Sequence, residues 1–330
     1  MDRSDQNREL RHVAAIINPG TRGSLVAALR ALRTAVPPGV RLEEFVSAGH
    51  ATTRAVVAEA AEHCDLVIAV GGDGTVATVA SGLIGTDVPL AIVPTGSTNV
   101  IAKELRLPGS PRAAAELAFR SSVRVHRDVG TYQDHCFLHM AGAGFDSQFF
   151  ENTDRELKRK IGWVAYLPAA LAALQIHPVE FRIVADGDLL EVVSSLVLVA
   201  NGSAVISPAF RLHPDIDSSD GWLDLLVFTA TEPSDVARTL GLLATSRLAD
   251  SPYLMTRRVR KVAIESAPSL SVQLDGDVVG QTPATFEIVP SGVQIVVNDP
   301  TIRLWPPFLA QNRFLTDVLK PATAGAGGKR

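Results

Sequence analysis

The stretch Ala69-Val70-Gly71-Gly72-Asp73-Gly74-Thr75 decides the fold, because it joins a strand to a helix through a glycine-rich turn. The residues before it, 66–70, form an apolar run typical of a buried parallel strand, and residues 76–80 are predicted to begin a helix. Glycines in such a turn allow positive φ and close approach of a ligand, and the helix N-terminus adds partial positive charge. The stretch therefore predicts a phosphate-binding turn, with a plain tight turn as the alternative. Asp73 repels a phosphate unless a divalent cation bridges the two or the carboxylate orients a neighbouring donor.

A second unit of the same kind follows further along the chain. The apolar residues 90–93 predict a strand, the turn is Pro94-Thr95-Gly96-Ser97-Thr98-Asn99, and residues 101–105 predict a helix. Neither turn has the Walker pattern or the dinucleotide fingerprint. Because both strands deliver glycine and hydroxyl residues at their carboxyl ends, the pair predicts a cleft for a phosphorylated ligand.

The first part of the chain alternates predicted strands and helices. A strand at 13–17 ends in Asn18-Pro19-Gly20, which either repeats the phosphate-facing geometry or is a simple strand-to-helix turn. The other predicted strands are at 41–45, 66–70 and from 90, and the predicted helices are at 24–35, 52–61, from 76, at 101–105 and at 110–120. This order predicts a doubly wound, Rossmann-like α/β half with the pattern β-α-β-α-β-α-β.

The sequence changes character after Val123. Predicted strands lie at 132–140, 181–185, 189–200, 223–229, 259–265, 270–274, 285–289 and 293–297, with Asp186-Gly187-Asp188 as a hairpin turn. Strands without regular crossover helices predict an antiparallel β-sandwich. We expect the boundary near 127–130, giving an α/β domain at 1–127 and a sandwich domain at 128–300.

Two predicted helices interrupt the sandwich, at 154–173 and 231–247. In the first, a basic stretch at 155–160 precedes an apolar stretch that contains Trp163 and Tyr166. This pattern fits docking on a membrane interface, but it fits better an ordinary helix that packs on a sheet and has a solvated charged start.

Composition narrows the class of protein. The chain has 330 residues, 46% of them hydrophobic, and a net charge of -4, which gives no global case for nucleic-acid binding. Its two cysteines, Cys64 and Cys136, form neither a disulfide framework nor a metal set and fit a reducing compartment. The N-terminus is polar, and no apolar run reaches about 18 residues. We therefore expect a soluble cytoplasmic protein, or one that sits on a membrane surface without crossing it.

Gly-Gly-Asp-Gly-Thr at 71–75, followed by Pro-x-Gly-x-x-Asn at 94–99, resembles the lipid kinase family that includes bacterial diacylglycerol kinases, sphingosine kinases and ceramide kinases. The resemblance extends over nearly the full length, through the turns at 18–20, 142–146 and 273–277. It implies a nucleotide domain like those of phosphofructokinases and NAD kinases, a β-sandwich lipid domain, and a C-terminal segment, 301–330, that packs back on the first domain.

The resemblance also implies roles for particular residues. Asp275 is the expected general base, because a lipid hydroxyl must lose its proton as it attacks the γ-phosphate of ATP, and Asp73 shares the catalytic centre. Mg²⁺ is expected at Asp73, Asp128 and Asp277. The expected ATP-binding residues are Asn18, Gly71, Gly72, Asp73, Gly74, Thr75, Thr95, Gly96, Ser97, Thr98 and Asn99. A separate structural cation is expected at Asp217 and Asp220 with the carbonyl of Trp222, the alternative being an acidic surface turn.

Two positions depart from the bacterial diacylglycerol kinase pattern. Val100 stands where those enzymes usually have Asp, so one carboxylate of the cation network is missing, and Asp277 replaces a Glu. Sphingosine and ceramide kinase-like members also have a nonpolar residue at the first position, so both departures bear on substrate identity.

The resemblance therefore implies an ATP- and Mg²⁺-dependent lipid kinase that is peripheral on the inner face of the membrane, with diacylglycerol as the default acceptor; the sequence itself shows only apolar helices able to line a pocket for a lipid. The resemblance also allows a homodimer. The alternatives are a kinase for a sphingoid or other lipid, a kinase for a soluble acceptor such as NAD kinases use, and a nucleotide- or lipid-binding regulator without catalysis. The basic run at 257–261 gives only a weak case for DNA binding and fits a solvated strand face or an anionic-lipid contact.

Overall fold

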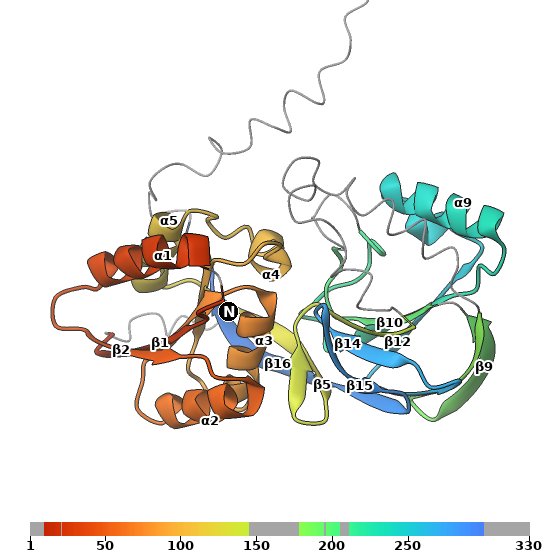
Figure 1. Cartoon of the computed structure of the whole chain (residues 1–330), viewed down its shortest axis with the longest axis horizontal. Helices are drawn as coiled ribbons and strands as arrows, with labels where there is room; N and C mark the ends of the chain where they lie inside the picture. Colours follow the sequence, from red (N-terminus) through yellow and green to blue (C-terminus); the bar gives the residue numbers. More distant parts are fainter. Residues whose placement is uncertain (1–9, 21, 145–177, 195, 205–210, 300–330) are drawn as a thin grey trace, which may run out of the picture.

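The computed structural model describes residues 10–20, 22–144, 178–194, 196–204 and 211–299, which form an α/β half and a β-sandwich half side by side (Figure 1). Three predictions fall outside the described residues: the helix at 154–173, the end of the turn at 142–146, and the C-terminal segment at 301–330.

The α/β half contains four parallel strands that alternate with helices. In chain order these are β1 (His12–Ile17), α1 (Arg22–Ala35), β2 (Arg41–Val46), α2 (His50–Ala61), β3 (Leu66–Gly71), α3 (Asp73–Leu83), β4 (Leu90–Pro94), α4 (Val100–Glu104) and α5 (Pro111–Arg120). The strands pair in the order β2-β1-β3-β4. The predicted β-α-β-α-β-α-β pattern is confirmed.

Helices cover both faces of this parallel sheet, with α1 and α5 on one side and α2 on the other (Figure 1). Alternate residues of one strand therefore enter different cores: Val13 and Ala15 pack with α1 and α5, whereas Ala14 and Ile16 pack with α2 and α3. Every residue of β3 is buried for the same reason. A continuous apolar run is what a strand buried on both faces requires.

The second half is a sandwich of antiparallel strands. They are β5 (Arg124–Tyr132), β6 (His135–Phe137), β7 (Met140–Ala143), β8 (Val179–Ala185), β9 (Asp188–Ser194), β10 (Leu196–Ala200), β11 (Leu223–Phe228), β12 (Leu254–Val259), β13 (Lys261–Ala267), β14 (Ser271–Leu274), β15 (Asp277–Gln281) and β16 (Ala284–Val296). One helix, α9 (Pro233–Ala244), and a short 3-10 helix, η3 (Leu248–Asp250), lie between β11 and β12.

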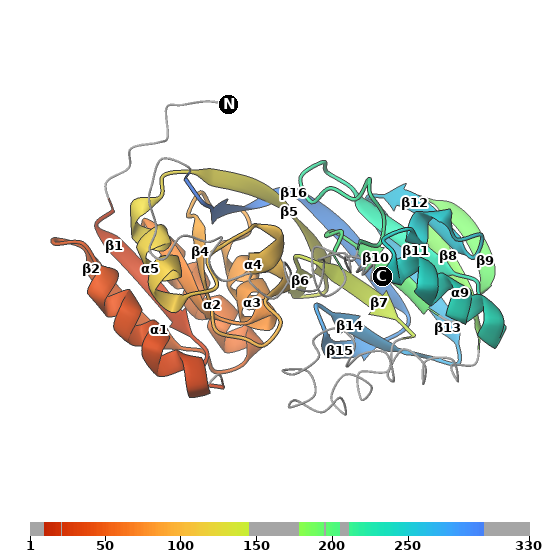
Figure 2. The same cartoon turned by 90° about the horizontal axis from the view of Figure 1, so that it is seen from above.

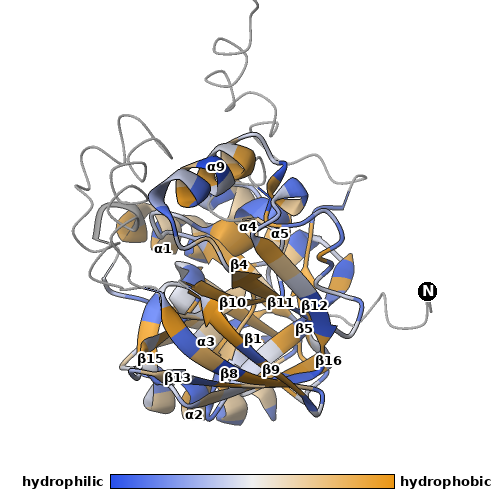
Figure 3. Ribbon diagram, turned by 90° about the vertical axis from the view of Figure 1, so that its right-hand side faces the viewer, coloured by the Kyte–Doolittle hydropathy of each residue, from blue (hydrophilic) through white to orange (hydrophobic). Residues whose placement is uncertain are grey.

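One layer of the sandwich has the strand order β12-β11-β10-β7-β14-β15, and the other contains β16, β13, β8 and β9. Their facing side chains form one core, in which Phe137, Phe181 and Phe286 are the largest fully buried members. Strands β4, β10 and β11 are largely hydrophobic in Figure 3. The predicted antiparallel sandwich is confirmed.

The predicted strand at 189–200 is wrong as a single strand, because the chain changes layer within it. β9 pairs with β8 through the hairpin at Asp186-Gly187, where φ is 51 and 94, and β10 pairs with β7 and β11 in the other layer. At the crossing, the buried Ser194 hydroxyl donates to the Phe228 carbonyl at 2.8 Å and accepts the Leu196 N–H at 3.2 Å. These bonds satisfy backbone groups that the change of layer would leave unpaired.

The predicted strands at 285–289 and 293–297 are one long strand, β16, with an irregularity between Val289 and Val293. Pro290 lies in that interval and has no N–H to give the ladder. β16 pairs with β13 and β5 in the sandwich, and Ile295 then pairs in parallel with Leu90 of β4. One ten-stranded sheet therefore runs through both halves, as the view from above shows (Figure 2).

The domain boundary at 127/128 stays a prediction. Strand β5 runs through it, and β16 belongs to the sheet of both halves. Among the described residues, no helix combines the length and apolar character needed to span a membrane.

Candidate active site

A cleft of about 730 Å³ lies between the parallel sheet and the sandwich. The carboxyl edge of the parallel sheet contributes the three predicted turns, and the β14–β15 turn contributes the two predicted acids. The predicted residues that line it are Asn18, Gly72, Gly74, Thr75, Gly96, Asp275 and Asp277. The structure thus brings together residues that lie far apart in the sequence.

The turns after β1 and β3 meet because these strands are neighbours at the point where the strand order reverses, which is where doubly wound sheets bind ligands. The Asn18 backbone N–H donates to the Val70 carbonyl at 2.9 Å, and its side-chain amide donates to Thr75 Oγ1 at 2.8 Å. Its Oδ1 accepts the Gly20 N–H at 2.8 Å. Asn18 therefore links the turn after β1 to the turn after β3.

The two glycine turns touch backbone to backbone. A Cβ on Gly96 would lie 2.6 Å from the Gly72 Cα, and a Cβ on Gly71 would clash with the Thr75 side chain. The Asn99 side chain closes its own turn, accepting the Gly96 N–H at 3.1 Å and donating to the Gly96 carbonyl at 2.7 Å. Asn99 has a φ of 48, a conformation that Asn tolerates better than most residues. Close contact within and between the two turns therefore requires glycine at positions 71 and 96, whether or not a ligand is bound.

Helix α3 begins at the cleft without a side-chain cap at Gly72. The N–H groups of its first turn are the donors that a phosphate accepts at a helix N-terminus. Asp73 Oδ1 accepts the Ile101 N–H at 3.1 Å, so this carboxylate also ties α3 to the start of α4. The chemistry of this edge fits a polyphosphate.

Asp275 is held by the peptide at 138–140. Its carboxylate accepts the N–H groups of Leu138 at 3.0 Å, His139 at 3.0 Å and Met140 at 2.9 Å. Burial raises the pKa of Asp275 to about 6, although the charge of His139 and the bonds from Leu138 and Met140 oppose the rise. A carboxyl group with that pKa can take a proton near neutral pH.

Asp277 points at the start of α3, where its Oδ2 would lie 2.6 Å from a Cβ on Gly74. Desolvation within the cleft and then the charge of Asp73 raise the pKa of Asp277, and the charge of Asp73 also raises that of Asp275. Three carboxylates therefore repel one another around the phosphate-binding edge. Hard oxygen donors with unbalanced negative charge fit Mg²⁺, with Asp73 and Asp277 as the residues that would hold it.

Asp128 lies elsewhere, and its predicted place beside the phosphates is corrected by the structure. It is 1% exposed, and its two carboxylate oxygens accept the N–H groups of Gly221 and Ser291, each at 2.6 Å. Asp128 therefore joins the turn before β11 to the irregularity in β16, which is a structural role.

The predicted structural cation site at Asp217, Asp220 and Trp222 has no support from the contacts of these residues. Asp217 Oδ1 accepts the N–H and the hydroxyl of Ser219 at 3.0 and 2.7 Å. Asp220 accepts the Trp222 N–H at 3.0 Å and a guanidinium N–H of Arg258. Because Arg258 already supplies positive charge, the contacts favour the acidic surface turn.

Two histidines on the wall of the cleft were not predicted. The rings of His50 and His135 stack with their centroids 3.9 Å apart, and His135 Nδ1 lies 2.8 Å from Asp134 Oδ1. These three residues form the one group of at least three His, Cys, Asp or Glu within the described part of the chain whose ligand atoms lie within 4.8 Å of one another. The lone pairs of stacked rings run parallel rather than converging, so the group does not form a metal site as it stands. No sequence signal links His50 to a hairpin turn this far along the chain.

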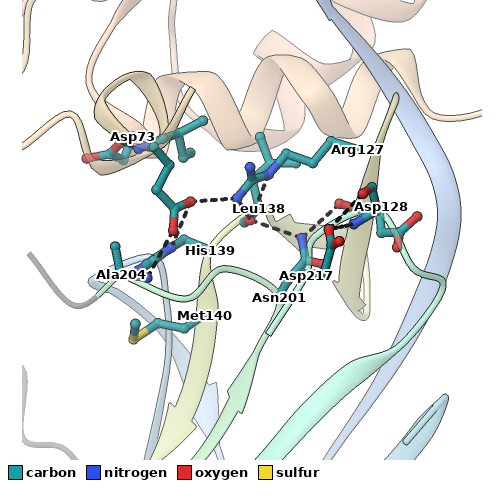
Figure 4. Close-up of polar contacts among 12 residues, drawn as sticks. Asp73, Arg127, Asp128, Leu138, His139, Met140, Asn201, Ala204 and Asp217 are labelled. Atoms are coloured by element: carbon teal, nitrogen blue, oxygen red, sulfur yellow. Dashed lines mark hydrogen bonds and ion pairs between the residues drawn. The ribbon is translucent and has the colours of Figure 1, made fainter. Parts of the chain in front are cut away.

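Sequence reasoning also missed a buried polar cluster next to the peptide that holds Asp275. It is made by Glu104, Arg127, His139 and Asn201, and Figure 4 labels the last three. The Arg127 guanidinium donates to Glu104 Oε2 at 2.7 Å, and Nδ1 of His139 lies 3.5 Å from the same oxygen. The Asn201 side chain donates to the carbonyls of Asp128 at 2.8 Å and Leu138 at 3.0 Å.

A doubly wound half and a sandwich that enclose two glycine turns and a buried carboxylate fit a phosphotransferase of the kinase class. Two family models match the chain: the diacylglycerol kinase catalytic domain over residues 12–131, and the YegS C-terminal NAD kinase beta sandwich-like domain over residues 139–297. The chain therefore belongs to the diacylglycerol kinase catalytic-domain family and is a lipid kinase by that membership.

Individual relatives agree with this assignment. The chain is 30% identical over 302 residues to a diacylglycerol kinase of Mycobacterium tuberculosis, covering 88% of this chain and 96% of the relative. A diacylglycerol kinase of Bacillus subtilis is 27% identical over 261 residues, covering 74% of this chain and 85% of that one. A solved structure of a Bacillus anthracis protein named as a diacylglycerol kinase has a TM-score of 0.74 at 25% identity, covering 92% of this chain and 100% of that one.

Proposed function

We propose that this protein transfers the γ-phosphate of ATP, with Mg²⁺, to a hydroxyl group of a membrane lipid, and that the acceptor is diacylglycerol, which becomes phosphatidic acid. The observation that carries the proposal is the single cleft in which both glycine turns face a carboxylate with a pKa of about 6. The names of the relatives support the acceptor.

In the proposed reaction the triphosphate lies on the N–H groups of the turns at 71–75 and 95–99, with Asn18 beside them. The lipid hydroxyl forms a bond to the γ-phosphorus, the bond from that phosphorus to the bridging oxygen of ADP breaks, and Asp275 takes the hydroxyl proton. The N–H groups that hold Asp275 leave part of its carboxylate for this proton. Mg²⁺, bound by Asp73 and Asp277, would supply neutralisation of phosphate charge.

A lipid acceptor implies that the enzyme works at a membrane surface. We propose that it associates peripherally with the inner face of the membrane in the cytoplasm, where ATP is available. Sedimentation with vesicles that contain the acceptor lipid tests this part, and failure to sediment at any lipid composition would refute it.

The decisive experiment measures transfer of labelled phosphate from ATP to a panel of lipids in mixed micelles with Mg²⁺. The wild type is compared with Asp275→Asn and with Asp87→Asn, a matched change at an exposed residue in the loop before β4. A labelled lipid that disappears only in Asp275→Asn supports the proposal, and its identity names the acceptor. Label on a sphingoid or a soluble acceptor would replace diacylglycerol, and ATP binding without transfer to anything would indicate a non-catalytic regulator.

A further inference from the structure

Three titratable residues that the proposed chemistry does not use lie together, next to the peptide that holds Asp275. Glu104 ends α4, Arg127 lies in β5, and His139 lies between β6 and β7. Their side chains are 12%, 5% and 6% exposed. Ionised groups are seldom buried this deeply without a specific arrangement of partners.

Glu104 is the centre of this cluster. One carboxylate oxygen accepts the Arg127 guanidinium at 2.7 Å and lies 3.5 Å from His139 Nδ1, and the other accepts the Ala204 N–H at 3.0 Å. Burial alone would raise the pKa of Glu104, but its contacts with His139, Arg127 and Ala204 outweigh burial and lower the pKa to about 2. Glu104 is therefore an anion throughout the range in which a kinase works.

The cluster acts on the peptide that holds Asp275. Nε and Nη2 of Arg127 donate to the Leu138 carbonyl at 3.3 and 3.1 Å, and the Asn201 side chain donates to the same carbonyl at 3.0 Å. The backbone N–H groups of Asn201 and Gly202 both donate to the His139 carbonyl at 2.8 Å. With these two carbonyls held on one side, the peptide donates its three N–H groups to the carboxylate of Asp275.

The His139 ring has little freedom to leave this arrangement. A Cβ on Gly202 would clash with Nδ1 of His139, so the ring packs directly on the backbone of that glycine. Both ring nitrogens are buried and have no hydrogen-bond partner among the described residues. The ring is therefore held by packing and by the charge of Glu104.

Glu104 is also connected, through helix α4, to the phosphate-binding turns of the parallel sheet. Helix α4 has five residues and begins directly after Asn99, which closes the second glycine turn, and Asp73 accepts the Ile101 N–H within its first turn. Glu104 is thus one short, rigid helix away from the turn that faces the phosphates.

We propose that Glu104 is a positioning residue for phosphoryl transfer, which fixes Asp275 relative to the phosphate-binding turns by holding the peptide at 138–140 through Arg127 and His139. The inference rests on the proposed function, because it takes Asp275 to be the base. A buried ion pair is weak evidence for stability, since apolar residues of similar size often fold as well. The placement of the charges, between the nucleotide turn and the base, is what the proposal explains.

The kinetic test replaces Glu104 by Gln and compares it with Glu116→Gln, a matched change on α5 whose partner is the exposed Arg112. We expect kcat to fall on the order of 10²-fold in Glu104→Gln, because small displacements of a catalytic group cost that much, while the KM for ATP stays within about twofold. We expect the control to keep the kcat of the wild type. An unchanged kcat, or a fall that is matched by weaker ATP binding, would overturn the proposal.

Glu104→Gln leaves Arg127 without a counter-charge, so a second variant, His139→Gln, keeps the Arg127 ion pair and removes the imidazole. The His139 ring packs on the backbone of Gly202, so its loss should loosen the peptide that holds Asp275 and lower kcat while the KM for ATP stays within about twofold. An unchanged kcat, or a fall that is matched by weaker ATP binding, would count against the proposal.

Amide hydrogen exchange separates this inference from the proposed function, because it needs no substrate. We expect exchange at 138–140 to be at least about tenfold faster in Glu104→Gln than in the wild type or Glu116→Gln, with exchange in β3 unchanged. Equal exchange in all three proteins would overturn the positioning role whatever the enzyme phosphorylates. If the wild type phosphorylates no lipid, the proposed function fails alone, and faster exchange at 138–140 would still support the path from Glu104 to Asp275.

Discussion

Lowering the pH from 7 to 5 is expected to slow phosphoryl transfer about tenfold, because Asp275 must be ionised to accept the proton of the acceptor hydroxyl. Burial raises the pKa of this carboxyl group from its ordinary 3.8 to about 6. A group with a pKa of about 6 is roughly nine-tenths ionised at pH 7 and about one-tenth ionised at pH 5. A carboxyl group with an ordinary pKa would be mostly ionised at both, and the rate would hardly change.

The assay is the initial rate of lipid phosphorylation between pH 5 and 8 at saturating ATP and acceptor and constant Mg²⁺. Thermal melts and the KM for ATP at each pH separate loss of ionisation from unfolding and from weaker nucleotide binding. In Asp73→Asn the acidic limb should move to lower pH, because the charge of Asp73 raises the pKa of Asp275. A rate at pH 5 within twofold of that at pH 7, in folded protein, would refute the assignment of Asp275 as a buried base. A limb that moves to higher pH in Asp73→Asn would refute the electrostatic argument.

Three further results are expected. Gly96→Ala should weaken ATP binding at least tenfold and lower the free energy of unfolding by about 1–3 kcal/mol, because the new Cβ would lie 2.6 Å from a backbone atom of the facing turn. Calorimetry and denaturant unfolding measure both. The control Gly241→Ala, inside helix α9 with open space around it, should leave ATP binding unchanged and raise the free energy of unfolding by up to about 1 kcal/mol. The pKa of Glu104 is lowered from 4.5 to about 2, so the stability that the ionised carboxylate gives the folded protein is complete above pH 4.5 and is lost as the pH falls through 2. The difference in unfolding free energy between the wild type and Glu104→Gln should therefore shrink by on the order of 3 kcal/mol over that range. A constant difference would contradict the ion pairing. Burial raises the pKa of Cys64 to about 11 and raises that of Cys136 further, so neither thiol of the folded protein should react with a thiol reagent at pH 8, and rapid labelling before unfolding would contradict the described packing.

The parallel half could be predicted from sequence because its signals are local. Each strand is a short apolar run, each turn after it contains residues that only turns favour, and the connections between parallel strands must be helices. The cleft followed from the same rule, since the carboxyl ends of neighbouring parallel strands meet. Asp275 was identified differently, through its resemblance to a known motif, and no local pattern distinguishes Asp275-Gly276 from an ordinary hairpin turn.

The sandwich was predicted as an architecture but not as a pairing scheme. Alternating apolar residues show that a strand is half-buried and do not show which layer it joins, so β9 and β10 were predicted as one strand. The two ends of β16 were predicted as two strands, because Pro290-Ser291-Gly292 is typical of a turn when read alone. Only its partners make it one strand: β5 pairs with it on both sides of the irregularity, β13 pairs with its first part, and β4 pairs with its end.

Charged residues in the core were the least predictable. Asp128 and Glu104 are both acids, and nothing local separates a carboxylate that accepts two backbone N–H groups from one that binds a cation or an arginine. The contacts that decide are long-range: Asp128 meets Ser291, and Glu104 meets Ala204. A buried acid is defined by which donors the fold brings to it, and those donors come from other parts of the chain.

The two departures from the diacylglycerol kinase pattern have a common physical basis in this cleft. Val100 is 7% exposed at the start of α4, where an aspartate would be buried beside the carboxylate of Asp73, which already bonds to Ile101. With that position apolar, the acids left around the phosphates are Asp73 and Asp277, with Asp275 as the proton acceptor. The shorter side chain at 277 still reaches α3, because Gly74 has no Cβ and the carboxylate of Asp277 fills that space. Gly74→Ala should therefore displace Asp277 and weaken the dependence of the rate on Mg²⁺ concentration more than it weakens ATP binding; an unchanged Mg²⁺ dependence would show that Asp277 does not share the metal.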